Sequence, residues 1–121
     1  MDNMANTFIR KVQKGIGTDT NGVQIGSYTV ASNPATKATV IGLSVSNTSA
    51  SSIDVDVVLS QNASNTTTDV SIVTNVPIPS GSTVVLIGGD QKLVMEGGDM
   101  IKVRSSASAS CDAIMSILEI T

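Results

Sequence analysis

The fold is decided by the stretch Ile53-Asp54-Val55-Asp56-Val57-Val58-Leu59, in which apolar and acidic residues alternate. Successive side chains of a β-strand point to opposite faces, so the two acids would share one face and most of the apolar residues the other. A strand of this kind has one face against a core and the other in water. The stretch therefore predicts a sheet that packs against a second layer.

The same period of two recurs on both sides of this stretch, for example at Ile41, Leu43 and Val45. Residues typical of turns separate the alternating segments at spacings of roughly 8–12 residues, which indicates a sandwich or barrel. Strands are expected at residues 7–14, 23–30, 38–47, 53–60, 69–76, 82–88, 91–96, 100–106 and 110–120. The pattern predicts an all-β fold, a single antiparallel β-sandwich (jelly-roll or Ig-like) of about eight or nine short strands. Residues 1–121 would form this one domain, with residues 1–14 an extended arm plus the first strand.

The C-terminal segment, residues 113–120, differs from the others because it is apolar on both faces. A strand in the centre of a sheet or at an interface has this pattern. A helix is the competing interpretation, and the β-branched content of the segment favours a strand.

The composition describes a thin core. Of 121 residues, 40% are hydrophobic, 14% are charged and 2% are aromatic, and Phe8 and Tyr28 are the sole aromatic residues. Aromatic side chains usually supply much of the burial in a small domain, so aliphatic residues have to build this core. The one cysteine cannot form an internal disulfide, and without histidine a zinc site would need unusual ligands. Association with other subunits is the remaining source of stability, which predicts a homo-oligomer.

The absence of histidine removes the usual general base at neutral pH. Catalytic triads, cysteine–histidine pairs and histidine-based metal centres are excluded within this chain. Two carboxylates could hydrolyse a glycoside, but such enzymes need a cleft that holds sugar, and aromatic residues are scarce. We therefore expect no enzyme activity, no catalytic, cofactor-binding or metal-binding residue, no cofactor and no small-molecule substrate.

Calcium binding is the alternative role for Asp54 and Asp56, with Asp69 or Asp90 as a further ligand. Calcium takes roughly six to eight oxygen ligands, usually from a compact loop. Two acids in an alternating strand instead lie side by side on its outer face. Solvated surface acids, which also discourage unwanted pairing between sheets, are the preferred interpretation.

Two glycine motifs and the cysteine also have structural interpretations. Gly88-Gly89-Asp90 and Gly97-Gly98-Asp99 fit tight turns between strands, because glycine accepts positive φ and aspartate suits turns. Cys111 fits a small buried or half-buried residue, since the sequence around it offers no base to activate a thiol.

Three asparagines, Asn47, Asn62 and Asn65, stand two residues before a serine or threonine. Such sites indicate exposed loops rich in serine and threonine. The longest exposed loop is expected at residues 60–68, where a solvated connection is favoured over a ligand site.

One basic cluster occurs, at Arg10, Lys11 and Lys14. In a strand, Arg10 and Lys14 point one way and Lys11 the other, which favours a solvated edge strand over docking on an acidic neighbour. The net charge of −3 and the scarcity of aromatic residues argue against nucleic acid as a partner. No membrane partner is expected either, because no apolar stretch approaches the roughly 20 residues of a membrane helix.

Residues 77–96 follow a layout of proline, serine–glycine, strand, glycine–aspartate and strand, which continues into residues 97–106 and closes with residues 116–120. Together with the opening residues 5–11, this layout resembles a family of small virion structural proteins of tailed bacteriophages, such as phages of marine bacteria and cyanobacteria. It covers most of the chain, from about residue 5 to the end. The layout also recurs in unrelated β-sandwich modules on virion surfaces and tails, and it carries no catalytic signature.

The resemblance implies a non-enzymatic bacteriophage virion protein, made in the host cytoplasm, that self-associates and contacts other virion proteins. Capsid decoration (a cement protein) is the preferred role, and a neck (head–tail connector) or tail accessory ring protein is the first alternative. A carbohydrate-binding or receptor-binding module is the second alternative. The arm at residues 1–14 and the C-terminal strand are the segments expected to reach a neighbour by main-chain pairing.

Overall fold

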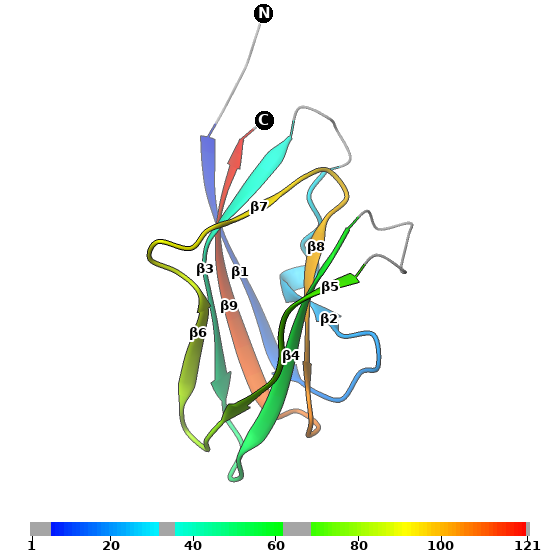
Figure 1. The fold of residues 1–121 in the computed structure, drawn as a ribbon, viewed down its shortest axis with the longest axis vertical. Coiled ribbons are helices and arrows are strands. Elements are labelled where there is room, and N and C mark those ends of the chain that lie inside the picture. Colours follow the sequence, from blue (N-terminus) through cyan, green and yellow to red (C-terminus); the bar gives the residue numbers. More distant parts are fainter. Residues whose placement is uncertain (1–5, 32–35, 62–68, 121) are drawn as a thin grey trace, which may run out of the picture.

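The computed structural model describes residues 6–31, 36–61 and 69–120, and within these ranges it shows strands and one turn of 3-10 helix (Figure 1). The elements are β1 (Asn6–Ile16), β2 (Val23–Gln24), η1 (Ile25–Ser27), β3 (Lys37–Asn47), β4 (Ile53–Ser60), β5 (Asp69–Ile78), β6 (Thr83–Ile87), β7 (Leu93–Met95), β8 (Met100–Ser105) and β9 (Cys111–Ile120).

The strands form two sheets that pack face to face (Figure 1). Sheet A has the order β1-β9-β3-β6, with β7 also paired to β3, and sheet B has the order β2-β8-β4-β5. All the pairings between these strands are antiparallel. The predicted all-β antiparallel sandwich is confirmed.

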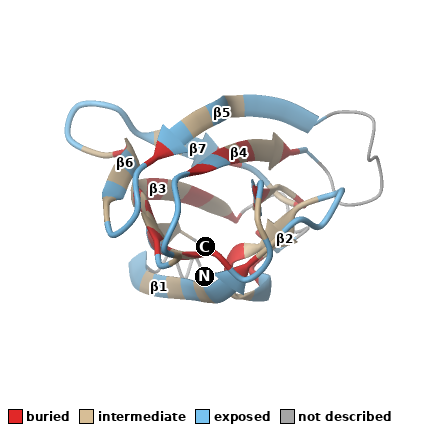
Figure 2. Cartoon of the chain, turned by 90° about the horizontal axis from the view of Figure 1, so that it is seen from below, coloured by how far each residue is buried: buried red, intermediate tan, exposed pale blue. Residues whose placement is uncertain are grey.

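The core lies between the two sheets, where every second residue of a strand turns inward. In β4, Ile53, Val55 and Val57 are buried, whereas Asp54 and Asp56 lie on the outer face. Figure 2 shows the sandwich from one end, with the buried segments on the strands that enclose the interior. The alternation that predicts the fold is therefore the alternation that builds the core.

The C-terminal segment forms β9, which lies in the interior of sheet A between β1 and β3. Met115 and Ile117 on its inner face are buried, and Ile114 and Leu118 on its outer face are partly exposed. The predicted strand is confirmed. Its second apolar face points away from the core, which matters for the interaction surface described below.

The strand expected at residues 23–30 is wrong beyond its first two residues. Gly26 and Ser27 adopt φ values of 60° and 56°, in the left-handed region, so the chain turns back as η1. The N–H of Gly26 donates to Oε1 of Gln13 at 3.1 Å, which ties this turn to β1. A period of two cannot distinguish such a turn from a strand when the turn also buries an apolar residue, here Ile25.

The exposed loop expected at Asn47 is also wrong, because Asn47 is buried at the end of β3. Its amide nitrogen donates to the backbone oxygens of Ser51 and Ile78, both at 2.8 Å, and its Oδ1 accepts from the N–H of Ser49 at 2.8 Å. The contact with Ile78 links sheet A to sheet B, since Ile78 ends β5. Asn62 and Asn65, with most of the loop expected at residues 60–68, lie outside the described residues.

Both glycine–aspartate motifs form turns, as predicted. Gly89 and Gly98 have φ values of 60° and 88°, which residues with a side chain rarely adopt. The N–H of Asp99 donates to the backbone oxygen of Glu96 at 3.0 Å, and the N–H of Gln91 donates to that of Gly88 at 3.1 Å.

Residues 6–16 of the N-terminal region form β1, an edge strand of sheet A, and residues 1–5 of the expected arm lie outside the described residues. In the part of the chain that the structure describes, no helix is long and apolar enough to cross a membrane.

Candidate functional site

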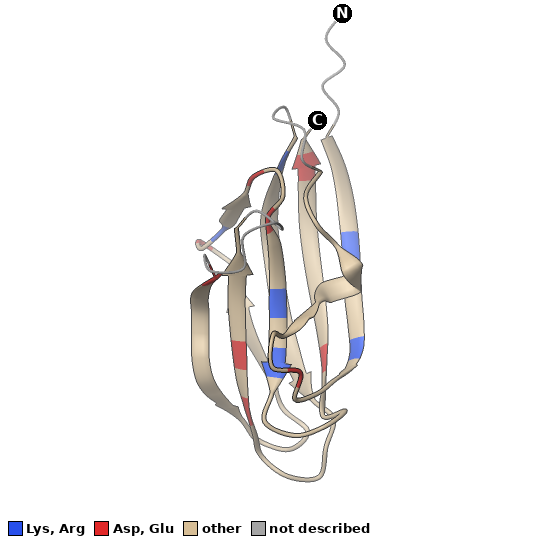
Figure 3. Cartoon of the chain, turned by 90° about the vertical axis from the view of Figure 1, so that its right-hand side faces the viewer, with Lys and Arg blue, Asp and Glu red and all other residues tan. Residues whose placement is uncertain are grey.

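The outer face of sheet B carries two ion pairs, and Figure 3 shows the acidic and basic residues of this side of the molecule. Nη2 of Arg104 on β8 lies 3.3 Å from Oδ2 of Asp56 on β4, because the register places these residues opposite each other. Nζ of Lys102, also on β8, lies 3.4 Å from Oδ2 of Asp69 on β5. We call these four residues, together with Val58, the charged face.

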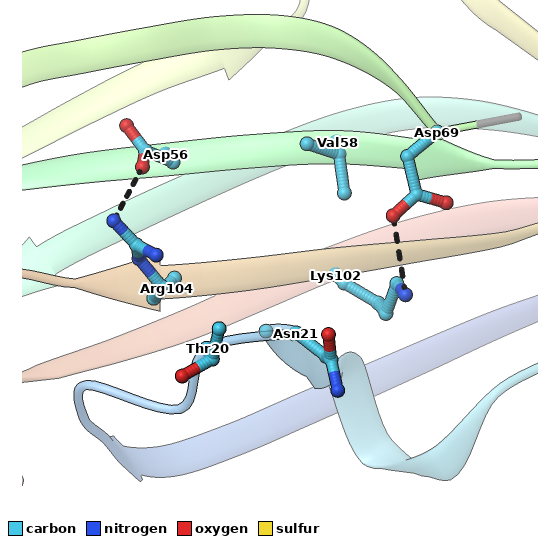
Figure 4. Close-up of a pocket in the computed structure, with 8 residues that line it drawn as sticks. Thr20, Asn21, Asp56, Val58, Asp69, Lys102 and Arg104 are labelled. Carbon is cyan, nitrogen blue, oxygen red and sulfur yellow. Dashed lines mark ion pairs between the residues drawn. The ribbon is translucent and has the colours of Figure 1, made fainter. Parts of the chain in front are cut away.

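A cavity of about 190 Å³ opens above the charged face, next to the loop that carries Thr20 and Asn21 (Figure 4). Its walls include both acids and both bases of the charged face, so the charges of the cavity neutralise one another. Figure 4 shows each carboxylate turned toward its basic partner. Each carboxylate that lines the cavity therefore has a basic partner within the same chain.

The acids considered as calcium ligands have other partners or lie apart. Oδ1 of Asp56 accepts a hydrogen bond from the N–H of Asn75 at 2.7 Å, in addition to its ion pair. Asp69 is paired with Lys102, and Asp90 lies in the turn between β6 and β7. Within the described ranges, no group of three or more histidine, cysteine, aspartate or glutamate side chains is placed to hold a metal ion.

Cys111 lies at the start of β9 and is fully buried. Burial raises the pKa of its thiol to about 11, with a further contribution from the charge of Asp112. Its Sγ lies 4.0 Å from the backbone oxygen of Ile16, a weak contact. A buried thiol with a raised pKa is a poor nucleophile, so the structure supports the predicted packing role.

The basic cluster of β1 is split between the two faces of its strand, as predicted. Arg10 and Lys14 are exposed, whereas Lys11 turns the other way and places its Nζ 5.8 Å from the centre of the Tyr28 ring. The hydroxyl of Tyr28 donates to Oε2 of Glu119 at 2.6 Å. Burial, together with the hydrogen bond to Glu119 and its charge, raises the pKa of Tyr28 above its ordinary value. These contacts connect the buried Tyr28 to β1 through Lys11 and to β9 through Glu119.

The outer face of sheet A has the opposite character, because its side chains are mainly apolar or small. It is formed by outward residues of β1, β9, β3, β6 and β7, namely Phe8, Arg10, Val12, Ile114, Ser116, Leu118, Thr39, Ile41, Gly42, Ser44, Val85 and Val94, with Lys37 and Ile120 at one end and Asp112 at the other. We call it the apolar face. Among the described residues, five of the six exposed large hydrophobic side chains lie on it: Phe8 (76% exposed), Val85 (68%), Val94 (59%), Val12 (53%) and Ile114 (50%).

Sequence reasoning found only part of the apolar face. The doubly apolar segment at residues 113–120 was predicted as a central or interface strand, and it supplies Ile114 and Leu118. The sequence pattern does not assign Phe8, Val85 and Val94 to a surface. The uninterrupted apolar run at residues 84–87 carries the same signal as the C-terminal segment, and it could have identified Val85.

No protein-family model matches this chain, and no curated protein matches it. Solved structures do share its fold. A mutant VP2 protein of infectious bursal disease virus, in T=1 particles, is 13% identical with a TM-score of 0.57 and covers 98% of this chain and 32% of its own. A chain of the T13 particle of the same virus is 12% identical with a TM-score of 0.56, covering 95% of this chain and 30% of its own.

A third similar structure comes from Bacillus endospore appendages, which form disulfide-linked pili. It is 13% identical with a TM-score of 0.52 and covers 98% of this chain and 88% of its own. This chain therefore spans about a third of the virus chains but most of the length of the pilus protein. At these identities the similarity establishes the β-sandwich fold.

Proposed function

We propose that this chain is a non-enzymatic structural subunit of a virion, which assembles by association between copies of itself. The observation that carries this proposal is the concentration of exposed large apolar side chains on one outer face of the sandwich. Contiguous apolar surface of this kind in a soluble domain marks an interaction site. The opposite sheet shows that the fold does not require such a surface, since its outer face carries two ion pairs.

The similar structures support an assembly role, because they belong to virus particles and to pili. Within a virion, capsid decoration is the role we propose first, and a ring protein of the neck or tail is the alternative. The symmetry of the assembly separates these roles, since threefold oligomers suit capsid junctions and rings suit the head–tail axis. The reach of residues 1–14 toward a neighbouring subunit stays a prediction.

A pilus-type filament subunit is a second candidate function. One observation favours it: this chain covers 88% of the endospore appendage protein, compared with about a third of each virus chain. Electron microscopy of the purified protein separates the candidates, because a filament subunit forms open fibres and a decoration protein forms closed oligomers.

The proposal is tested by the oligomeric state of the purified protein, measured by light scattering and native mass spectrometry. The wild-type chain is expected to form oligomers at micromolar concentration. Phe8→Asp places a charge on the apolar face and is expected to weaken association by on the order of 100-fold. The matched control is Val70→Asp, because Val70 is the exposed large apolar residue on β5, in sheet B and outside the apolar face. A wild-type chain that stays monomeric at high concentration would contradict the proposal.

A further inference from the structure

The apolar face is organised in rows that cross the strands, because the register places one outward residue of each strand beside the next. One row runs Phe8, Leu118, Thr39, Val94, and another runs Val12, Ile114, Ser44, Val85. Between them, Arg10, Ser116 and Gly42 form a shorter row. Each long row therefore crosses sheet A from β1 to the opposite edge.

Side-chain size follows the same order in both long rows. The residues on β1 and β9 are large, the residue on β3 is a small hydroxyl residue, and the row ends with a valine on β6 or β7. The middle row adds two small residues, Ser116 and Gly42. β3 is therefore the floor of a shallow trough at Thr39, Gly42 and Ser44, and the large side chains of β9 form a ridge beside it. The trough is interrupted by Ile41, which is half-buried at the bulge of β3.

We infer that the apolar face binds the same face of a second copy of this chain, about a twofold axis that runs parallel to the strands between β9 and β3. This inference rests on the proposed function, in which copies of the chain associate; the twofold pair is then the unit from which a threefold or ring assembly is built through other surfaces. Rotation about this axis keeps each row at the same position along the strands and reverses the order of the strands across the sheet. As a result, β9 of one copy lies over β3 of the other. Ile114 then packs over Ser44 of the other copy and Leu118 over Thr39, so each ridge fills the trough opposite. Phe8 and Val12 meet Val94 and Val85 at the rims.

The direction of the axis follows from size and charge. A twofold axis across the strands would place β1 over β1 of the second copy, which brings the exposed Arg10 and Lys14 of both copies together. It would also place β3 over β3 and the ridge of β9 over the same ridge of the second copy, so the large side chains would meet one another. The axis along the strands instead places β1 over β6 and β7, which carry no charged residue. Arg10 and Lys14 of the two copies then lie at opposite edges of the contact, while Lys37, at one end of β3, lies nearer the axis.

The size of the face fits a contact between two proteins. Three strands of 10 or 11 residues, with the shorter β6 and β7 sharing the fourth position, span roughly 600 Å² at a spacing of about 4.8 Å and a rise of about 3.3 Å per residue. Side chains standing out from the sheet add to this area, and a stable interface buries about 800 Å² on each partner. In the end-on view of Figure 2, no other described element covers the outer side of sheet A. The face is therefore open and large enough for a second copy.

Two single variants test the pairing of Ile114 with Ser44. Ser44→Asp and Ile114→Lys each bury an unpaired charge at the contact, so each variant alone is expected to associate on the order of 100-fold more weakly than wild type. In a mixture, Asp at position 44 of one chain faces Lys at position 114 of the other, while the second site of the heterodimer keeps its native residues. Native mass spectrometry of the mixture is expected to show a heterodimer within about 10-fold of wild-type affinity.

A second pair, Val12→Lys with Val85→Asp, repeats the test at two more exposed positions and remains informative if a central variant fails to fold. Val70→Lys is the control and is expected to leave association unchanged, and circular dichroism monitors folding of each variant. A wild-type chain that associates while neither mixture forms a heterodimer would overturn the twofold pairing and leave the proposed function standing. A wild-type chain that never associates would overturn both.

Discussion

The two outer faces of the sandwich are built from the same alternation of residues, yet they differ in whether their side chains find partners within the chain. On the charged face, Asp56 and Asp69 find basic partners on β8 within the same chain. On the apolar face, Phe8 and Ile114 remain exposed. A face that pairs its own polar groups is complete in the monomer, whereas an exposed apolar face becomes complete only when another surface covers it.

This difference separates the stability of the domain from its association. A partly exposed ion pair such as that of Arg104 with Asp56 contributes about 0–1 kcal/mol, and an exposed apolar side chain contributes little to the stability of a monomer. The core between the sheets therefore supplies most of the free energy of unfolding. Changes on the inner side of a strand should act on folding, and changes on the outer side of sheet A should act on association.

The largest expected effect comes from two adjacent residues of β9 that point to opposite sides. Met115 is buried, so Met115→Ala leaves a cavity and should lower the free energy of unfolding by about 3 kcal/mol. Ile114 lies on the apolar face, so Ile114→Ala should cost the monomer less than about 0.5 kcal/mol. Urea denaturation of dilute, monomeric protein measures both values.

The same two variants should show the reverse order in association. Ile114→Ala removes part of the ridge and should raise the dissociation constant of the oligomer by about 10-fold, whereas folded Met115→Ala should keep its affinity. Equal losses of stability in the two variants would show that the outer side of β9 belongs to the core, and the comparison between faces would fail.

The pH dependence of the free energy of unfolding tests a residue of the interior, Cys111, and neither of the two outer faces. The pKa of Cys111 is raised by burial to about 11, compared with an ordinary value near 9. The unfolded chain therefore loses this proton first, so the stability linked to Cys111 is complete below about pH 9 and declines as the pH rises toward 11. Raising the pH from 8 to 10.5 should cost about 2 kcal/mol through this group.

Cys111→Ala is the control, because it removes this titration and keeps every other ionisable group, including Tyr28. The difference in free energy of unfolding between wild type and Cys111→Ala should shrink above pH 9. A difference that stays constant up to pH 10.5 would mean that the thiol ionises normally in the folded protein.

The sequence predicted the fold well where the side-chain pattern is local. Residues 53–59 alternate, and the structure places their acids outside and most of their apolar residues inside. The C-terminal strand was found because it is apolar on both faces. The segment at residues 23–30 failed, because the left-handed backbone at Gly26 and Ser27 ends the strand without interrupting the apolar pattern.

The apolar face could be predicted only in part, because it depends on contacts between distant segments. Phe8, Leu118 and Thr39 are far apart in the sequence and become neighbours through the register of three strands. The ion pairs are similar, since Asp56 meets Arg104 through the pairing of β4 with β8. A period of two assigns a residue to one side of its strand, but it does not say which strand lies next to it.

The smallest expected effect lies on the charged face. Asp56→Ala removes the partner of Arg104 and the acceptor for the N–H of Asn75, whose φ of 52° places it in the left-handed region. The Arg104 side chain is 45% exposed, so solvent screens the ion pair and the loss should be about 1 kcal/mol. Ser44→Ala on the apolar face should change the stability of the monomer by less than about 0.3 kcal/mol.

Salt identifies how much of this loss is electrostatic. Between 0.05 and 0.5 M NaCl the Debye length falls from roughly 14 Å to roughly 4 Å, so the charge-dependent part of the Asp56→Ala loss should diminish. Asp56→Asn keeps an acceptor for Asn75 and removes only the charge, so its cost should be smaller than that of alanine and should nearly vanish at high salt. Association through the apolar face should respond in the opposite way, staying constant or strengthening, because burial of apolar surface does not depend on screening. If wild-type association weakened steeply with salt, charged residues such as Arg10 would hold the copies together, and the two faces would differ less than their side chains indicate.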